Sequence, residues 1–328
     1  MLQRDEIIAR IEKAARNLAA SYIKKFKKSD TLSCYIKLIT DPVMLQSYSS
    51  EVLDSEKVRY LCKASETYLK EKKLEPEDLA GLLYLKSKLE GFRDKVTCRY
   101  VVIDEAQDFS LFQFYVLKHV LDTENFTILG DLSQGIYAYR GVKSWQDVEE
   151  QIFSGQATCL TLRQSYRTTI EIMELANQIL QQGMGTDMVL AEPVVRHGSE
   201  PEVKTYTKTN ELAAAAIDKI KVLRREGCSS VAIIGKTLQE CKKIKKLLEK
   251  QGFAGLTLLT GDEDSYQVGV MIVPSYAAKG LEFDGVLIVN LEAKYQKNEL
   301  DAKLLYVAVT RAMHSLIVYA MKDTIAFM

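Results

Sequence analysis

Hydrophobic and polar residues follow two different patterns along the chain, which change near residue 98. Beyond this point, short apolar or β-branched runs alternate with stretches whose apolar residues recur at helical spacing. The strand-like runs are CRYVVI (98–103), FTILG (126–130), TCLTL (158–162), EVKTY (202–206), SVAII (230–234), GVMIV (269–273), GVLIVN (285–290) and SLIVYA (315–320). Helices are predicted over 111–121, 145–153, 168–182, 209–225, 237–250 and 298–312. Alternation of this length predicts an α/β fold with parallel sheets covered by helices.

The first part of the chain, residues 1–95, is predicted to be helical throughout. Apolar residues in 7–26 recur at helical spacing, and no β-rich run interrupts the segment. Its lysine clusters are interpreted as solvated helix faces, with nucleic-acid contact as the alternative. A further boundary is predicted at SGQA (154–157), so we expect three parts: 1–95, 96–155 and 156–328.

Composition restricts the class of protein. The 328 residues include 44 basic and 44 acidic side chains, so contact with a nucleic acid would need a local basic patch rather than a global field. The six cysteines form no C-x-x-C pair and there are only three histidines, which argues against a structural zinc site. No apolar run approaches the ~18 residues of a membrane span. A cytoplasmic protein with free thiols is therefore expected.

A group of acidic residues follows one predicted strand directly. In VVIDEAQDFS (101–110), three apolar residues lead into Asp104 and Glu105. Loops at the carboxyl ends of parallel strands form the ligand crevice of such sheets. A carboxylate there can hold Mg²⁺ that bridges nucleotide phosphates, and a second one can orient or deprotonate an attacking water. The alternative is an acidic helix N-terminus that complements the helix dipole.

Five segments in fixed order resemble the motifs of the UvrD/Rep-type superfamily 1 helicases. DEAQD (104–108) resembles their Walker B box, 128–141 motif III, 162–169 motif IV, 274–288 motif V and 303–316 motif VI. The resemblance covers about residues 98–320 and implies two RecA-like domains of the P-loop NTPase fold. Residues 96–155 would be an incomplete first domain, and 156–328 the second. ATP would bind between them, with DNA, single-stranded or duplex, as the other partner in the bacterial cytoplasm.

The resemblance also implies a role for individual residues. Asp104 would bind Mg²⁺, Glu105 would be the catalytic base, and Gln134 would sense the γ-phosphate. Arg167 and Arg311 would be arginine fingers, which stabilise charge on the transferring phosphoryl group. The residues implied to contact nucleotide are Tyr166, stacked on adenine, and Gly280 and Glu282, in the nucleotide-facing loop. Tyr139 and Arg140 would contact nucleic acid, Tyr139 by stacking on a base. Arg140 could instead pair with Asp131. Tyr137 and Tyr139 could alternate on a strand with one of them in the core, and Tyr139 is favoured as the exposed one.

The phosphate-binding loop G-x-x-x-x-G-K-[ST] of this family is not found before DEAQD. Gly235, Lys236 and Thr237 provide a G-K-T, but Ser230 stands where the first glycine should be, and the position falls after motif IV. We therefore expect ATP and Mg²⁺ to bind productively only together with a missing N-terminal portion of the same protein. This chain alone is expected to be inactive.

Two departures from the UvrD pattern point to one branch of the family. Only about 105 residues separate motifs IV and V, which leaves no room for a large strand-separating subdomain. Pro274 and Tyr276 replace the usual motif V residues, and the segment is similar to HelD-type factors, which recycle RNA polymerase. Residues 1–95 would then be the tail of an arm inserted in the first domain. The alternatives are a fragment of a conventional 3′–5′ DNA helicase and a non-catalytic module that binds nucleic acid or polymerase.

Overall fold

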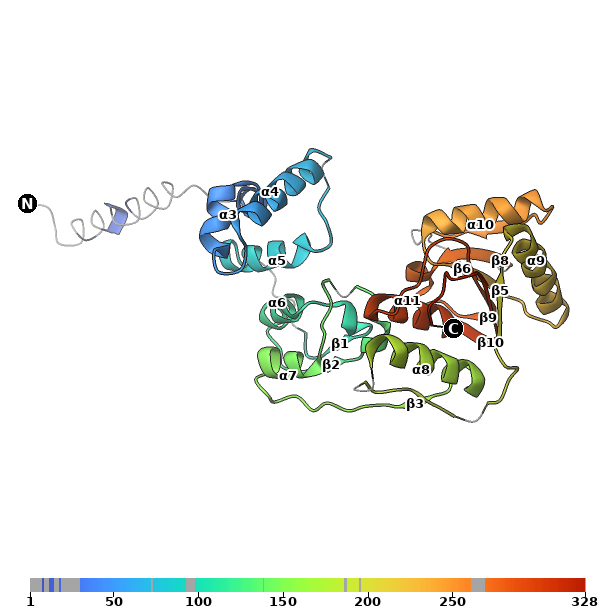
Figure 1. Cartoon of the computed structure of the whole chain (residues 1–328). Helices are drawn as coiled ribbons and strands as arrows, with labels where there is room; N and C mark the ends of the chain where they lie inside the picture. Colours follow the sequence, from blue (N-terminus) through green and yellow to red (C-terminus); the bar gives the residue numbers. More distant parts are fainter. Residues whose placement is uncertain are drawn as a thin grey trace, which may run out of the picture. The chain divides into compact units, whose positions relative to one another are not determined.

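A computed structural model of the chain describes residues 8, 12–14, 18, 30–71, 73–92, 98–137, 139–185, 188–194, 196–260 and 269–327 (Figure 1). The chain forms two compact units. Unit 1 contains Met1–Val101 and Phe112–Phe126, and unit 2 contains Val102–Leu111 and Thr127–Met328. The helix predicted over 7–26 lies largely outside the described residues.

Unit 1 is helical where it is described before residue 93, as the sequence predicts. Its helices are α2 (Thr31–Thr40), α3 (Pro42–Ser49), α4 (Ser55–Lys70), α5 (Asp78–Leu89) and most of α6 (Leu111–Leu121). The first three begin at aspartates, since the carboxylates of Asp30, Asp41 and Asp54 accept hydrogen bonds from first-turn amides. The Tyr35 hydroxyl donates to Asp78 at 2.7 Å and fastens α2 to α5.

Unit 2 is built on one six-stranded parallel sheet with the strand order β5-β10-β9-β6-β8-β7. The strands are β5 (Glu202–Tyr206), β6 (Val231–Gly235), β7 (Leu256–Leu258), β8 (Val270–Pro274), β9 (Phe283–Asn290) and β10 (Ala312–Met321). The helices around it are α8 (Ile170–Met184), α9 (Thr209–Arg225), α10 (Leu238–Lys250) and α11 (Glu299–Val309). The predicted α/β architecture with helix-covered parallel strands is confirmed.

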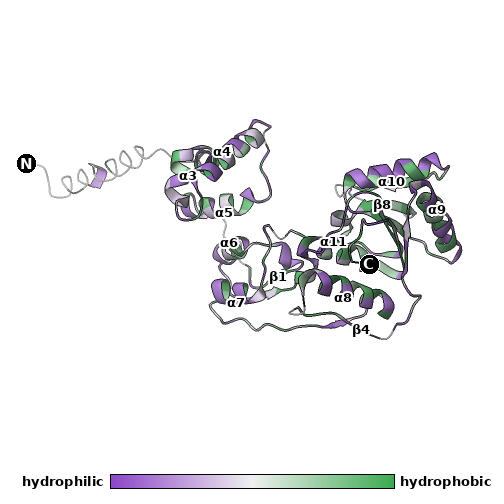
Figure 2. Ribbon diagram, in the orientation of Figure 1, coloured by the Kyte–Doolittle hydropathy of each residue, from purple (hydrophilic) through white to green (hydrophobic). Residues whose placement is uncertain are grey.

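The central strands are buried on both faces because helices cover each side. Ile234 and Ile288 belong to the core shared with α8 and α11, whereas their neighbours Ile233 and Leu287 belong to the core shared with α9 and α10. This alternation follows from the two-residue repeat of a strand, and it explains why these strands read as continuous apolar runs. Figure 2 shows the same separation on α9 and α10, which have hydrophobic and hydrophilic faces.

Smaller elements carry the loops of interest. Strands β1 (Val101–Ile103) and β2 (Phe126–Ile128) pair, as do β3 (Gln164–Ser165) and β4 (Glu192–Pro193). Short 3₁₀ turns η1 (Ala106–Asp108), η2 (Leu132–Gln134) and η3 (Ser275–Ala278) follow β1, β2 and β8, and helix α7 spans Trp145–Phe153. These turns lie at the carboxyl ends of their strands, where ligand-binding loops of α/β sheets gather.

Two local expectations differ from the structure. TCLTL (158–162) was predicted as a strand but has no assigned strand, and its Leu160 and Leu162 are 82% and 91% exposed. The reason is that apolar alternation favours a strand only where a neighbouring strand completes the hydrogen-bonded ladder. Likewise, Tyr137 and Tyr139 lie in a turn region and not on a strand.

The predicted boundary at 154–157 corresponds to a sharp turn after α7. Ser154 and Gly155 both have positive φ, and the Gly155 amide donates to the Glu149 carbonyl at 2.9 Å, as at a helix C-terminus. The two compact units do not divide at this turn, because residues on both sides belong to unit 2. The division into 1–95, 96–155 and 156–328 stays a prediction.

The Asp284 carboxylate gives the unit a pH-dependent tie between β9 and the start of β6. It accepts from the Ser229 and Ser230 amides at 2.7 and 2.8 Å and from both hydroxyls, and these bonds, Ser229's foremost, lower its pKa to about 2. Since the pKa is depressed in the folded state, stabilisation is present above the unfolded value of ~3.9 and is lost as pH falls from about 5 to about 2.

We expect Asp284→Asn to flatten the fall in unfolding free energy between about pH 5 and pH 2, measured by urea titration. An equally steep fall in the variant would contradict this.

Candidate nucleotide site

Asp104 and Glu105 lie at the carboxyl end of β1, as the sequence predicts. Ile103 is buried, and the next residues leave the strand in a tight turn in which the Glu105 amide donates to Asp104 Oδ1 at 2.8 Å. Glu105 has a φ of 51°, a left-handed conformation that is uncommon for a residue other than glycine. The Ala106 amide donates to the Leu129 carbonyl at 2.9 Å and fixes the turn to the segment after β2. The glutamate is therefore held in a strained turn, as residues at functional sites often are.

Gln107 is a site residue to which sequence reasoning assigned no role. It is 1% exposed, its Nε2 donates to Glu105 Oε2 at 2.5 Å, and its Oε1 accepts from the Asp131 amide at 3.0 Å. A Cβ at Gly130 would lie 2.6 Å from Gln107 Oε1, so glycine leaves the room that this side chain needs. Gln107 thus ties the loop after β1 to the loop after β2. In the sequence, only the position of Gln107 inside DEAQD could have indicated that it belongs to the site.

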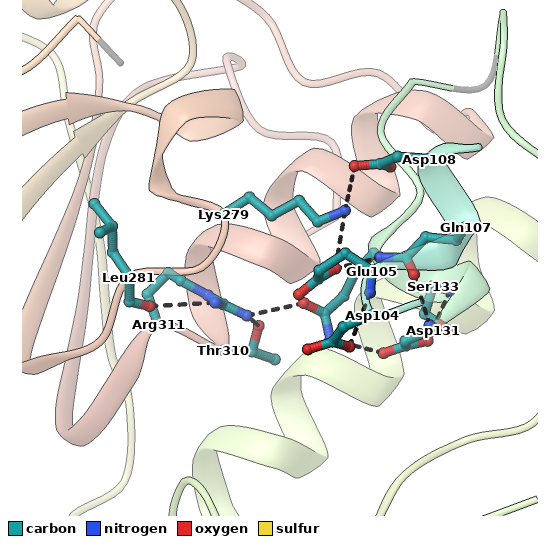
Figure 3. Close-up of polar contacts among 11 residues, drawn as sticks. Asp104, Glu105, Gln107, Asp108, Asp131, Ser133, Lys279, Leu281, Thr310 and Arg311 are labelled. Carbon is teal, nitrogen blue, oxygen red and sulfur yellow. Dashed lines mark hydrogen bonds and ion pairs between the residues drawn. The ribbon is translucent and has the colours of Figure 1, made fainter. Parts of the chain in front are cut away.

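Lys279 is the second residue that the sequence did not single out. Its Nζ lies 3.1 Å from Glu105 Oε2 and 2.7 Å from Asp108 Oδ2, and its side chain is only 10% exposed (Figure 3). Gly280, which follows it, has a φ of +80° and supplies a backbone conformation that side-chain-bearing residues rarely adopt. Partial burial opposes ionisation of Glu105, but hydrogen bonds from Lys279 and Gln107 outweigh it and lower the Glu105 pKa. Glu105 is therefore a carboxylate at neutral pH.

Arg311 and Gln134 meet, although 177 positions separate them. The Arg311 guanidinium is 1% exposed, and its Nη2 donates to Gln134 Oε1 at 3.1 Å. Its other N–H groups donate to the carbonyls of Val307 and Leu281, at 3.0 and 3.2 Å. Burial, followed by the nearby charge of Arg167, lowers the Arg311 pKa to about 10, so the group is still cationic at neutral pH. Figure 3 shows Arg311 and Lys279 pointing toward the loops that carry Glu105 and Asp131.

Arg167 and Glu282 form an ion pair at the same site. Arg167 Nε lies 2.7 Å from Glu282 Oε1, and both side chains are partly exposed. Tyr166 is exposed, and its hydroxyl donates to Gln164 at 3.0 Å. The charge of Arg167 is one cause of the lowered pKa of Arg311, so the two guanidinium groups lie near each other, and their role as arginine fingers stays a prediction. The implied contacts of Tyr166 with adenine and of Glu282 with ribose stay predictions.

Tyr139 is the exposed member of its tyrosine pair, as expected. It is 78% exposed, and its ring lies 6.4 Å from that of Tyr137 in an edge-to-face arrangement. The Arg140 guanidinium lies over both rings, 4.5 Å from the Tyr137 centroid and 5.7 Å from that of Tyr139. An exposed ring beside a cation can stack on a base and contact its phosphate.

Gly235, Lys236 and Thr237 do not form a phosphate-binding loop. Thr237 caps α10, and Lys236 uses its amide to donate to Glu240 Oε2 at 3.0 Å. The Lys236 ammonium lies 2.7 Å from Asp301 Oδ1, in a largely buried pair. This lysine and its amide thus make contacts within unit 2, in agreement with the sequence-based interpretation.

Asp104 provides one exposed carboxylate at this site, although no group of three or more His, Cys, Asp or Glu side chains among the described residues is arranged to hold a metal ion. Asp104 is exposed, and its Oδ1 accepts only a local amide bond among the bonds described. Mg²⁺ is usually held by one or two carboxylates, with waters and phosphate oxygens completing its shell. Asp104 could supply one such ligand.

The helices of the described residues include none with the length and apolar character of a membrane span.

Two protein-family models match the chain. The UvrD/REP helicase N-terminal domain matches residues 3–146, and the UvrD-like helicase C-terminal domain matches residues 269–319. The matches therefore include the Asp104–Asp108 loop in the first domain, and Lys279 and Arg311 in the second.

Several curated proteins are similar in sequence. DNA helicase II of Escherichia coli is 28% identical over 42% of this chain and 19% of its own length. The ATP-dependent DNA helicase PcrA of Bacillus subtilis is 23% identical over 47% and 21%, and a probable DNA helicase of Mycoplasma pneumoniae is 27% identical over 68% and 43%. The chain thus spans from about a fifth to two fifths of these relatives. Both domain matches and these similarities show that the chain carries regions similar to the N- and C-terminal domains of UvrD-like helicases.

Proposed function

We propose that the chain is part of an ATP-driven motor that acts on DNA. The observation that carries this proposal is the bond between Arg311 and Gln134, 3.1 Å long, beside the ion pair between Lys279 and Glu105. Phosphoryl transfer needs cations that stabilise developing charge and a group that positions the attacking water, held in fixed geometry. The described residues bring together side chains suited to both tasks.

The roles follow from the chemistry of each group. Glu105 accepts from Lys279 and has a lowered pKa, so it suits orientation of the attacking water better than strong proton abstraction. Arg167 and Arg311 would stabilise the transferring phosphoryl group. Gln134, which accepts a hydrogen bond from Arg311, would connect the phosphoryl group to the segment that carries Tyr139 and Arg140. Asp104 would hold Mg²⁺, which when bound neutralises phosphate charge. Tyr166, Gly280 and Glu282 would form the nucleoside side of the site.

A phosphate-binding loop is the component that this proposal adds to the chain. The loop amides and lysine of G-x-x-x-x-G-K-[ST] supply much of the binding energy for the β- and γ-phosphates. We propose that ATP turnover requires such a segment, supplied by a longer gene product or as a separate polypeptide. The complemented protein is this chain together with such a segment. In this proposal 96–155 and 156–328 act as two RecA-like domains, with 1–95 as a helical accessory.

DNA is the favoured partner, because the similar proteins are named DNA helicases. Tyr139 and Arg140 would contact a single strand. A second candidate is remodelling and recycling of RNA polymerase by a HelD-type factor. Pro274 and Tyr276 in motif V favour this candidate. The compactness of residues 156–328 also favours it, because the described helices between Arg167 and Pro274, and the strands from β5 onward, all belong to the six-stranded sheet or to the helices that cover it.

The complemented protein should hydrolyse ATP with Mg²⁺ and be stimulated by single-stranded DNA, whereas the chain alone should not turn over. Glu105→Gln should lower turnover by about 10²–10⁴-fold, because the amide cannot accept a proton and orients water poorly. Glu150→Gln, on the exposed face of α7, is the matched control. Glu105-dependent turnover by the chain alone would contradict the need for the loop. A complemented protein without DNA-stimulated turnover would contradict the motor. Strand unwinding compared with release of stalled polymerase then separates the two candidates.

A further inference from the structure

The segment that follows β4 runs alongside the segment that carries Arg167. Gln164 pairs with Glu192 and Ser165 with Pro193 in parallel register, and the Val194 amide donates to the Ser165 carbonyl at 3.1 Å. Beyond this pairing, Arg196 lies beside residues 167–170, since its carbonyl accepts from the Ile170 amide at 3.0 Å. No motif identified in the sequence includes this arginine.

Arg196 joins the backbone next to both catalytic arginines. Its Nη2 donates to the Arg167 carbonyl at 2.9 Å and to the Met313 carbonyl at 2.5 Å. Met313 lies two residues after Arg311, at the start of β10. One nitrogen therefore connects segments that are 146 positions apart in sequence, using one N–H group for each carbonyl.

The backbone of Arg196 is itself fixed to the start of α8. Its carbonyl accepts from the Ile170 amide at 3.0 Å. The following residues are held by Glu171, which accepts from the Gly198 amide at 2.8 Å and lies 2.9 Å from His197 Nδ1. The side chain thus extends from an anchored backbone, which makes it a rigid link rather than a loose surface contact.

We propose that Arg196 is the positioning residue of the arginine pair: it sets the distance between the backbones from which Arg167 and Arg311 reach the transferring phosphoryl group. This rests on the proposed function of that pair. A displacement of ~1 Å at a charged group that contacts the transition state can lower a rate by ~10²-fold. A planar guanidinium is suited to this task because its N–H directions are fixed, whereas a flexible ammonium would leave the two carbonyls less strictly spaced.

The first arm of the test uses this chain as it is. NMR of arginine side chains reports the Nε–H of Arg167, which donates to Glu282, and Arg167→Lys assigns its signal by removing it. Arg196→Ala should move this signal to the position of a solvent-exposed arginine. Arg163→Ala is the matched control, since Arg163 lies on the same strand segment, is exposed, and contacts only Glu192 at 3.8 Å among the pairs described. If Arg196→Ala unfolds the chain, Arg196→Met, which keeps a long side chain but no N–H donor, replaces it. An unchanged Arg167 signal in a folded variant overturns the proposal.

The second arm measures turnover of the complemented protein. Arg196→Ala should lower kcat about 10²-fold and leave the KM for ATP within about threefold, because the arginines act on the transition state more than on binding. The double variant with Arg167→Ala should be no slower than Arg167→Ala alone, since Arg196 acts through Arg167; multiplied effects would indicate a general structural role and overturn the proposal. Arg196→Lys should recover part of kcat. If the unmodified complemented protein shows no turnover, the proposed function fails, and the NMR arm still decides whether Arg196 positions Arg167.

Discussion

Replacing Arg311 by alanine is expected to lower ATP turnover of the complemented protein by about 10³–10⁵-fold, the range seen when a transition-state arginine is lost. The guanidinium is 1% exposed and points its Nη2 at Gln134, so no solvent-exposed side chain can take its place. Arg311→Lys should recover little, because one ammonium cannot contact Gln134 and also satisfy the two carbonyls that the guanidinium holds.

The same substitution should also destabilise unit 2. The Leu281 carbonyl would lose its guanidinium donor, and an acceptor left unpaired away from water costs about 1–3 kcal/mol. The Val307 carbonyl would lose the same donor but would still accept from the Thr310 hydroxyl at 3.1 Å. Turnover and urea unfolding should therefore be measured together, with Arg225→Ala, an exposed arginine of α9, as the control. Turnover within tenfold of the unmodified protein, in a variant that binds nucleotide normally, would contradict the role of Arg311.

The sequence predicts the central part of the fold well, and the reason is physical. Strands β6 and β9 are buried on both faces by helices, so they carry uninterrupted apolar runs, and the amphipathic α9 and α10 face them. The position of Asp104 and Glu105 could also be predicted, since the strand and the acids that end it are contiguous. Local sequence suffices where the neighbours that fix an element are adjacent in the chain.

The contacts across the site could not be predicted in the same way. Lys279 meets Asp108 over 171 positions, and Arg196 meets Met313 over 117. No periodicity or composition encodes such pairs, because they depend on how two loops from different strands approach each other. TCLTL illustrates the converse error, in which a local preference for a strand exists without the neighbouring strand that would realise it. Motif order identified which segments gather, but not which atoms meet.

Glu240 is an example in which the local sequence is misleading until the structure is known. It follows G-K-T and resembles an ordinary first-turn acid of α10, yet it is 3% exposed. Its Oε1 accepts from the amides of Leu291, Glu292 and Ala293, at 2.8, 2.9 and 3.1 Å, and its Oε2 accepts from the Lys236 amide. The carboxylate therefore holds the turn after β9 against the turn after β6, in the place where a phosphate-binding loop would leave its amides free for an anion.

Glu240→Ala is accordingly expected to lower the free energy of unfolding of unit 2 by about 3–5 kcal/mol, as when one partner of a buried charged network is removed. Four amides that the carboxylate satisfies would lose their acceptor, and at 3% exposure water has little access to replace it. Glu240→Gln should cost less, because one amide oxygen can still accept from part of the set. Glu249→Ala, at a half-exposed position of the same helix, should change stability by no more than about 0.5 kcal/mol. Urea unfolding followed by circular dichroism measures all three. If Glu240→Ala were no more destabilising than Glu249→Ala, the amides would have found other acceptors, and the carboxylate could not be what fixes the two turns to each other.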